Sequence, residues 1–459
     1  MTPRNTLLSL LCLFGLFPFT ALRSQQDLWS LERCVNYALD NNIMIKQQEI
    51  STRYSKNNLT QSVANLFPNL NANGGYSHSE GRALDNTTYQ FNPIVNSVNA
   101  SINSSITLFS GFQKVNTVRQ NKIDLLASLQ DLQKLKNDIS LNIAAAYLQI
   151  LFNEELLAVQ KLQQDVTRQQ VDRTEKLVAA GSLPRGNLLE IQAQYATEEV
   201  QVVNAKNQLD LSYLTLTQFL DLDSVGNFRI ETPVFGEISS QGMPASLMDV
   251  YLDAEQKMPQ VKSAEYKLRS SEVGLSMAYG SISPRVSLSY YYGSNYSDAG
   301  KKQVGVDTMG IPIFSDNYPL NEQFRDNASS TVTAGVSVPL FNGLMNATSI
   351  SNAKLAIANS KLALENTKNI LYKDIQQAYA DALAALNKYN ASEKSLEAQK
   401  ESFKYTQQKF EVGLVTTVDF NTAKNTLART ESDLLQAKYD YLFRINILNF
   451  YRGMPITIK

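Results

Sequence analysis

The chain carries one pattern twice, and this duplication constrains its fold more than any other feature. The sequence Leu-Phe-Ser-Gly ends at Gly111, and Leu-Phe-Asn-Gly ends at Gly343, 232 residues later. Seventy residues after each of these glycines stands another, Gly181 or Gly413, at the end of a helical pattern. At 1.5 Å per residue, a helix of most of that length reaches roughly 90 to 105 Å. The sequence therefore predicts two long arms of equal length, far longer than one domain core requires.

Apolar residues recur at every seventh position after both Gly181 and Gly413. A sustained seven-residue repeat is typical of helices that supercoil around their neighbours. We therefore expect each arm to fold back at its glycine into an antiparallel helical hairpin. The first copy carries Leu188, Tyr195, Val202, Leu209 and Leu216, and the second Phe420, Leu427, Leu434, Tyr441 and Leu448.

Alternating segments precede the arms and predict β-strands. In residues 98–108 most apolar side chains have even numbers and most polar ones odd numbers, so the strand has one apolar and one uncharged polar face. Four such strands are expected, at about 69–78, 97–109, 285–293 and 331–341, with polar loops at about 79–97 and 294–330. The pattern alone fits either a soluble core or a membrane, with the apolar face toward lipid and the polar face toward a lumen.

Four strands are too few to close a barrel, because the smallest closed membrane barrels have about eight. Open sheet edges are not tolerated in lipid. If the strands lie in a membrane, oligomerisation must close them, with eight strands in a dimer and twelve in a trimer. The predicted fold class is therefore α+β, with long helical hairpins and four membrane strands per chain.

The chain divides into two repeats flanked by short segments. An apolar run behind Arg4 predicts a secretory signal peptide over residues 1–24. We expect the first repeat at 25–222, a Gly- and Pro-containing connector at 223–245, the second repeat at 246–453 and a tail at 454–459. The hairpin tips are expected near 181–187 and 413–419.

Composition argues against several functional classes. Lys and Arg (42) nearly balance Asp and Glu (43), so nucleic acid is not an expected partner. His78 is the only histidine, and one cysteine, Cys34, remains after the signal peptide, so no metal site, cofactor or catalytic residue is predicted. The carboxylate pairs Glu154–Glu155 and Glu198–Glu199 are interpreted as solvated helix faces. We expect no enzyme.

Taken together, the signal peptide, the duplicated plan, the two strand exits and the glycine-led tips resemble the TolC family of outer-membrane efflux and secretion channels. An amide or acidic residue also stands six positions after each tip glycine, at Asn187 and Asp419. The resemblance implies a homotrimer with a twelve-stranded barrel in outer-membrane lipid and a helical tunnel in the periplasm of a Gram-negative cell. It also implies docking to a periplasmic adaptor (membrane-fusion) protein that links the channel to an inner-membrane pump.

The resemblance also implies roles for individual residues. At the tips, the glycines have a simpler alternative role as helix C-caps. Asp419 matches an acidic residue of the closed periplasmic entrance, and Arg185 is a candidate partner for it across neighbouring hairpins, although an exposed tip charge is the simpler interpretation. The expected adaptor contacts are Gly181, Ser182, Leu183, Pro184, Gly413, Leu414, Val415 and Thr416; the expected entrance residues are Asp419, Asn187 and Arg185; and the expected barrel-to-tunnel junction comprises Phe109, Gly111, Phe341 and Gly343.

Three functions remain open from the sequence. The first is a passive exit duct for small molecules in a tripartite efflux pump. The second is the outer-membrane duct of a type I protein secretion system. The third, from a different class, is a secreted coiled-coil structural protein or adhesin.

Overall fold

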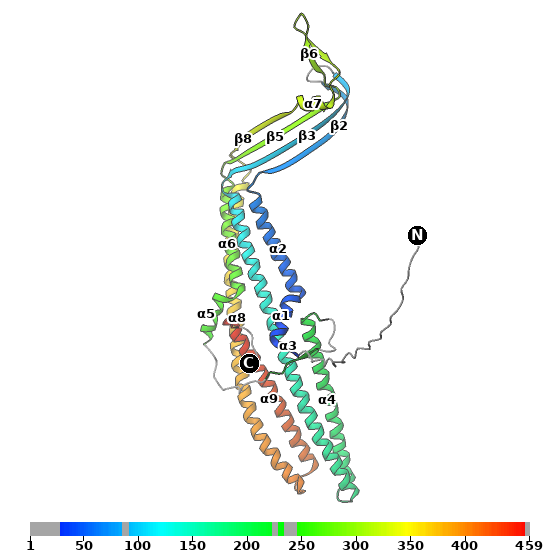
Figure 1. The fold of residues 1–459 in the computed structure, drawn as a ribbon. Helices are drawn as coiled ribbons and strands as arrows, with labels where there is room; N and C mark the ends of the chain where they lie inside the picture. The colour runs from blue at the N-terminus through cyan, green and yellow to red at the C-terminus, as the bar shows by residue number, and fades with distance from the viewer. Residues whose placement is uncertain (1–27, 85–90, 223–227, 234–245, 455–459) are drawn as a thin grey trace, which may run out of the picture.

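The structure, a computed structural model, describes residues 28–84, 91–222, 228–233 and 246–454. The predicted signal peptide, most of the connector and nearly all of the tail lie outside the described residues. Figure 1 shows an elongated molecule with a sheet at one end, helices running away from it, and two helical hairpins side by side at the far end. Long helices and a smaller set of strands agree with the α+β expectation.

The two hairpins have matching lengths. In the first, α3 (Gln113–Ala179) has 67 residues and α4 (Arg185–Phe219) has 35. In the second, α8 (Met345–Glu411) and α9 (Thr417–Tyr451) again have 67 and 35 residues. A straight helix of 67 residues is roughly 100 Å long, in the predicted range. The heptad positions on α4 and α9 are all buried or half-buried, as supercoiled packing requires.

Two 22-residue helices, α2 (Ile43–Ala64) and α6 (Pro259–Gly280), run beside the upper parts of α3 and α8. Each is preceded by an 11-residue helix, α1 (Leu31–Asn41) or α5 (Leu247–Lys257). Neighbouring contacts arrange the upper helices in the order α2, α3, α6, α8. In the described part of the chain, no helix combines the length and the apolar character needed to cross a membrane.

The main sheet has the strand order β2-β3-β5-β8, and every neighbouring pair is antiparallel. Its strands are β2 (Asn69–Leu84), β3 (Phe91–Ser110), β5 (Arg285–Ser297) and β8 (Ser329–Ser337). The first three are longer than predicted at their outer ends. The prediction for the fourth was wrong at its inner end, because residues 338–341 are not in a strand. Pro339 has no N–H to donate, and β8 is an edge strand with a neighbour on one side only.

The long segment between β5 and β8 was predicted as a loop, but it contains β6 (Lys302–Val306), β7 (Pro312–Ser315) and α7 (Leu320–Asp326). Side-chain hydrogen bonds from Ser294, Asn327 and the buried amide of Gln323 hold α7 against the end of β5. Gln323 is 2% exposed, accepts from the Ser297 N–H at 3.0 Å and donates to the Ser297 and Tyr318 carbonyls. Hydrophobic periodicity does not reveal order of this kind, because the order depends on hydrogen bonds between side chains and backbone.

Two apolar cores lie where the short helices meet the long ones. The first joins α1, α3 and α4 and includes the two-residue strands β1 (Leu28–Trp29) and β4 (Arg229–Ile230). In this core the Tyr147 hydroxyl donates a hydrogen bond to the Glu231 carbonyl at 2.5 Å. The second joins α5, α6, α8 and α9 around Leu371, Ile375 and Leu448. We call the region where the short helices α1 and α5 meet the long helices the waist of the molecule, and both cores lie there. The arms beyond the waist depend on contacts between helices.

Candidate functional site

The sheet has two chemically different faces. The registers of all three strand pairs place odd residues opposite odd and even opposite even over most of their length. On the odd face, Asn73 donates to Asn103 at 3.1 Å and Ser77 bonds to Ser97 at 2.6 Å. On the even face, large apolar side chains are exposed, among them Leu70 (75%) and Val336 (70%). One face therefore suits water and the other suits lipid.

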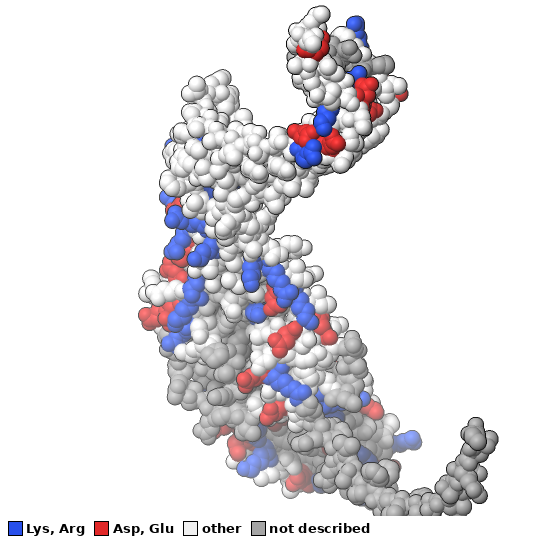
Figure 2. Space-filling view, turned by 45° about the horizontal axis from the view of Figure 1, so that its top comes forward, with Lys and Arg blue, Asp and Glu red and all other residues white. Residues whose placement is uncertain are grey.

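Charge is almost absent from the four main strands. The exceptions are Arg285 at the start of β5, and Glu80 and Arg82 toward the outer end of β2. Figure 2 shows this uncharged surface as white, with blue and red side chains gathered on the helices and at the outer end. A band without charge is what burial of one face in hydrocarbon requires.

The predicted junction residues lie at two similar turns. Gly111 and Phe112 both have left-handed backbone conformations (φ 59° and 61°), and so do Gly343 and Leu344 (φ 63° and 65°). The first turn directly follows β3, the second follows β8 after five residues that are not in a strand, and each begins a 67-residue helix. The rings of Phe109 and Phe112 pack edge to face at 5.6 Å. These turns redirect the chain from the sheet into the long helices. The role of Phe109, Gly111, Phe341 and Gly343 as a junction between barrel and tunnel stays a prediction.

Both tip glycines are helix C-caps. Gly181 has φ 73°, and the Ser182 N–H donates to the Leu177 carbonyl at 2.9 Å. Gly413 has φ 77°, and the Leu414 N–H donates to the Lys409 carbonyl at 2.9 Å. These bonds are the Schellman pattern, which favours glycine. Both glycines therefore have the capping role, and both remain exposed.

The second tip begins α9 with a capping box. The Thr416 hydroxyl donates to the Asp419 carboxylate at 2.6 Å and accepts from the Asp419 N–H at 3.1 Å, while the Thr416 N–H donates to the carboxylate at 3.1 Å. The hydroxyl hydrogen bond, followed by the backbone one, lowers the pKa of Asp419 from its ordinary 3.8. Asp419 therefore has a structural role at the start of a helix.

The two tips touch each other through one predicted residue. Asn187 on α4 donates to the Thr417 hydroxyl on α9 at 3.4 Å. Arg185 is exposed, and within the described chain no ion pair joins it to Asp419. Of the remaining tip residues, Leu414 is 74% exposed, Leu183 and Val415 are half-buried, and Ser182, Pro184 and Thr416 are exposed. The tips thus offer a small surface of mixed chemistry at the far end of the molecule (Figure 1).

A buried charge cluster that the sequence interpretation missed joins the two hairpins above their tips. Lys424 on α9 is 2% exposed and lies 3.0 and 3.2 Å from the carboxylate oxygens of Glu198 on α4. It also donates to the Gln163 carbonyl on α3 at 2.7 Å and to the Thr167 hydroxyl. Burial lowers the pKa of Lys424, and the hydrogen bond and charge of Glu198 oppose that effect. The ion pair and its hydrogen bonds therefore connect α9 of the second hairpin with α3 and α4 of the first.

Glu198 corrects a sequence interpretation. It is 3% exposed, so the prediction of a solvated face was wrong for Glu198 but correct for its neighbour Glu199. Glu154 and Glu155 are half-buried, and they accept hydrogen bonds from Tyr213 at 2.7 Å and Tyr439 at 2.5 Å. These carboxylates are engaged in packing between helices.

The sequence did hold a signal for the buried pair. Lys424 lies between the heptad residues Phe420 and Leu427, and Glu198 lies between Tyr195 and Val202. In each case the spacing of three and four residues puts the charge on the apolar stripe of its helix. A cation and an anion on facing stripes indicate a buried ion pair.

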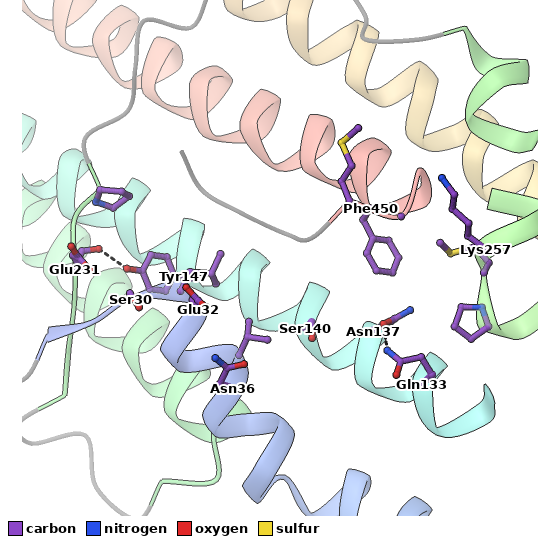
Figure 3. Close-up of a pocket in the computed structure, with 17 residues that line it drawn as sticks. Ser30, Glu32, Asn36, Gln133, Asn137, Ser140, Tyr147, Glu231, Lys257 and Phe450 are labelled. Carbon is purple, nitrogen blue, oxygen red and sulfur yellow. Dashed lines mark hydrogen bonds between the residues drawn. The ribbon is translucent and has the colours of Figure 1, made fainter. Parts of the chain in front are cut away.

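A cavity of about 1030 Å³ lies at the waist and is lined by residues of α1, α3, α5 and α9, among others. In Figure 3 the Tyr147 hydroxyl bonds to the Glu231 carbonyl, and Gln133 bonds to Asn137. The one lysine in its wall, Lys257, already donates to the Arg452 carbonyl at 2.8 Å. Among the described residues no group of three or more His, Cys, Asp or Glu side chains could hold a metal ion. The candidate site is therefore the sheet, the junction and the tips.

Comparisons with known proteins agree with this geometry. The profile of the family described as outer membrane efflux protein matches residues 34–221 and 250–453. The chain is 22% identical to outer membrane protein TolC of Escherichia coli over 85% of its own length and 75% of that protein. It is 21% identical to the alkaline protease secretion protein AprF of Pseudomonas aeruginosa, over 96% and 88% of the two chains.

Solved structures show the same fold. A crystal structure of CusC, whose description refers to transmembrane channel formation, superposes with a TM-score of 0.76 at 17% identity and covers 93% of this chain and 92% of that one. The predicted resemblance is confirmed, and the chain belongs to the outer membrane efflux protein family.

Proposed function

We propose that the protein is a trimeric outer-membrane channel that continues into a periplasmic tunnel and serves as the passive exit duct of a tripartite efflux pump. The observation that carries the proposal is the sheet. It has four nearly uncharged strands, two faces of opposite polarity and two free edges, and it leads through tight turns into 67-residue helices. A membrane sheet with free edges must be closed by further copies.

Three copies would supply twelve strands, with the odd face toward a wide aqueous lumen. The equal helix lengths in the two hairpins support two structural repeats, so that three chains would present six similar hairpins around one axis. The helices are long enough to cross much of the periplasm. Transport through such a duct needs no catalytic residue, and the energy would come from the inner-membrane pump.

The tips would contact the periplasmic adaptor protein. The exposed residues Gly181, Ser182, Pro184, Gly413 and Leu414 are suited to this role, since a C-capping glycine can also be touched by a partner. Asn187, Arg185 and Asp419 would lie at the periplasmic entrance. A pairing of Arg185 with Asp419 would have to form between neighbouring hairpins of the assembly.

The main alternative is a duct for protein secretion, because the relative AprF is named for alkaline protease secretion. The two ducts would share the channel and differ in cargo. The family assignment gives no support to the third possibility, a secreted structural protein or adhesin.

Paired lysine substitutions test the channel. Asn103 lies on the odd face and the adjacent Ile102 on the even face. We expect Asn103→Lys to assemble and to shift the ion selectivity of single channels in planar bilayers toward anions. Ile102→Lys would place a charge in lipid at a cost of about 2–4 kcal/mol and should reduce the amount of protein in outer membranes. Equal behaviour of the two variants, or no channel from the wild type, would contradict the proposal.

Cargo is tested in a strain that lacks the protein. If the protein is an efflux duct, this strain should be more susceptible to drugs, dyes or detergents, and the wild-type protein should restore resistance. The amounts of secreted proteins should not change. The reverse outcome would favour the secretion duct.

A further inference from the structure

We infer that cationic side chains on the outward faces of α3 and α8, just beneath the sheet, bind anionic phospholipid headgroups of the inner leaflet of the outer membrane. The inference rests on the proposed channel and deepens it by naming a lipid partner for its surface. Both helices begin directly beneath the sheet (Figure 1). The residues that carry the inference are Arg119 and Lys122 on α3 and Lys354 on α8, and all three are exposed.

The helix ends nearest the sheet carry an excess of positive charge. The ten residues nearest the sheet, about 15 Å of helix, were compared in α2, α3, α6 and α8. In these stretches the carboxylate is Glu272 alone, and the cations are Lys56, Lys114, Arg119, Lys122 and Lys354. Five cations against one carboxylate leave four uncompensated positive charges per chain.

Neither ion pairing nor the helix dipole accounts for these cations. Within the described chain no ion pair joins Arg119, Lys122 or Lys354 to a carboxylate, whereas farther from the sheet Lys267 lies 2.9 Å from Asp131. The dipole of a helix favours carboxylates near its start, yet the first turns of α3 and α8 contain no acidic residue. The charges are therefore available to a partner outside the chain.

Phe112 identifies the lipid side of α3. In the β3–β5 pair, Phe109 faces Val286, and even-numbered residues of β5 belong to the apolar face of the sheet. The ring of Phe112 packs edge to face on the ring of Phe109. Phe112 therefore lies on the side of the molecule that would face lipid.

The exposed stripe of α3 changes from apolar to cationic with distance from the sheet. Phe112 is 66% exposed and Val115 is 52% exposed. Arg119 and Lys122 follow Val115 at spacings of four and seven residues, which place all three on one face of the helix. The two cations lie roughly 9 and 14 Å below the start of α3.

The second repeat has the same arrangement. Lys354 stands eleven residues after Gly343, as Lys122 stands eleven residues after Gly111. Leu344, the equivalent of Phe112, is also 66% exposed. Three copies would place six such lysines at one level around the channel.

An apolar residue followed by cations suits the boundary of a membrane. Outside the hydrocarbon, the headgroup region is about 5–8 Å thick on each side. Lys and Arg can extend their apolar stems toward the hydrocarbon while their charges stay among the headgroups. One such cation near a membrane surface favours anionic over neutral headgroups about fivefold.

Tryptophan reporters at the two turns test the inference in the full-length protein. Phe112→Trp and Leu344→Trp are each reconstituted into phosphatidylcholine vesicles with either brominated phosphatidylglycerol or brominated phosphatidylcholine, whose bromine atoms quench nearby tryptophan fluorescence. The one native tryptophan, Trp29, lies at the waist beside Tyr147, roughly 50 Å down α3, and gives a constant background.

At low salt, we expect phosphatidylglycerol to bind beside both reporters about fivefold more strongly than phosphatidylcholine. Salt at about 1 M should remove most of this preference by screening. Arg119→Gln combined with Lys122→Gln should abolish the preference at the Phe112→Trp reporter and leave it at the Leu344→Trp reporter. Lys354→Gln should do the reverse, so each reporter is the control for the other.

The outcomes separate this inference from the proposed function. Equal quenching by the two lipids, or a preference that survives the glutamine substitutions, would overturn the inference and leave the channel intact. Absence of quenching by either lipid at both reporters would show that the turns do not lie at a membrane. That result would reject the proposed channel and this inference with it.

Discussion

At the scale of single residues, the Lys424–Glu198 pair is the contact whose loss should be most damaging. Removing one partner from a buried ion pair leaves an uncompensated charge and costs about 3–5 kcal/mol. We expect Lys424→Met and Glu198→Gln each to lower the temperature at which the purified protein loses helical circular dichroism. The combined variant should lose much less than the sum of the two, because no charge then remains buried.

Glu199 supplies the matched control for this double-mutant cycle, because it is adjacent to Glu198 in sequence but exposed. Glu199→Gln should leave the melting temperature nearly unchanged. If the effects of Lys424→Met and Glu198→Gln simply add, the two charges are not coupled and the hairpins are joined by other contacts.

At the scale of elements, the start of α9 should depend on pH in a way that the start of α4 does not. Asp419 has a lowered pKa, so its capping interaction is complete above pH 3.8 and is lost as the pH falls through the lower folded-state value. Pro184 at the start of α4 makes no side-chain cap. We expect Asp419→Asn to speed amide hydrogen exchange over residues 414–420 relative to wild type near pH 6, with the ratio approaching one well below pH 3.8.

Thr416→Ala should have a similar local effect at neutral pH, worth about 1 kcal/mol. Asp433→Asn, farther along α9 at an exposed position, is the control and should leave exchange at the tip unchanged. A constant ratio for Asp419→Asn across the pH range would show that its carboxylate does not stabilise the tip.

The elements themselves were predictable to different degrees. The long helices and tip glycines followed from heptad spacing and equal arm lengths, which are properties of the sequence alone. The end of β8 could not be predicted from the sequence, because the residues after Ser337 have no neighbouring strand within one chain. Burial of Glu198 was also missed, because it depends on a lysine that is 226 residues away and becomes a neighbour only through packing of the two hairpins.

At the scale of the whole molecule, the length of the arms should determine whether the tips reach their partner. A heptad can be removed from both helices of a hairpin without disturbing the apolar stripes, which shortens the hairpin by about 10 Å. Deleting 156–162 with 203–209, and 388–394 with 435–441, would shorten both hairpins equally. This keeps Asn187 beside Thr417 and Glu198 beside Lys424.

We expect this shortened protein to assemble in the outer membrane and form channels in planar bilayers, but to lose export in cells because its tips no longer reach the adaptor. Deleting only the second pair of segments is the control. It displaces one tip from the other by about 10 Å, so Lys424 loses Glu198 and assembly itself should fail. Wild-type export by the equally shortened protein would show that arm length does not set the docking position, and that the contact with the pump lies nearer the waist.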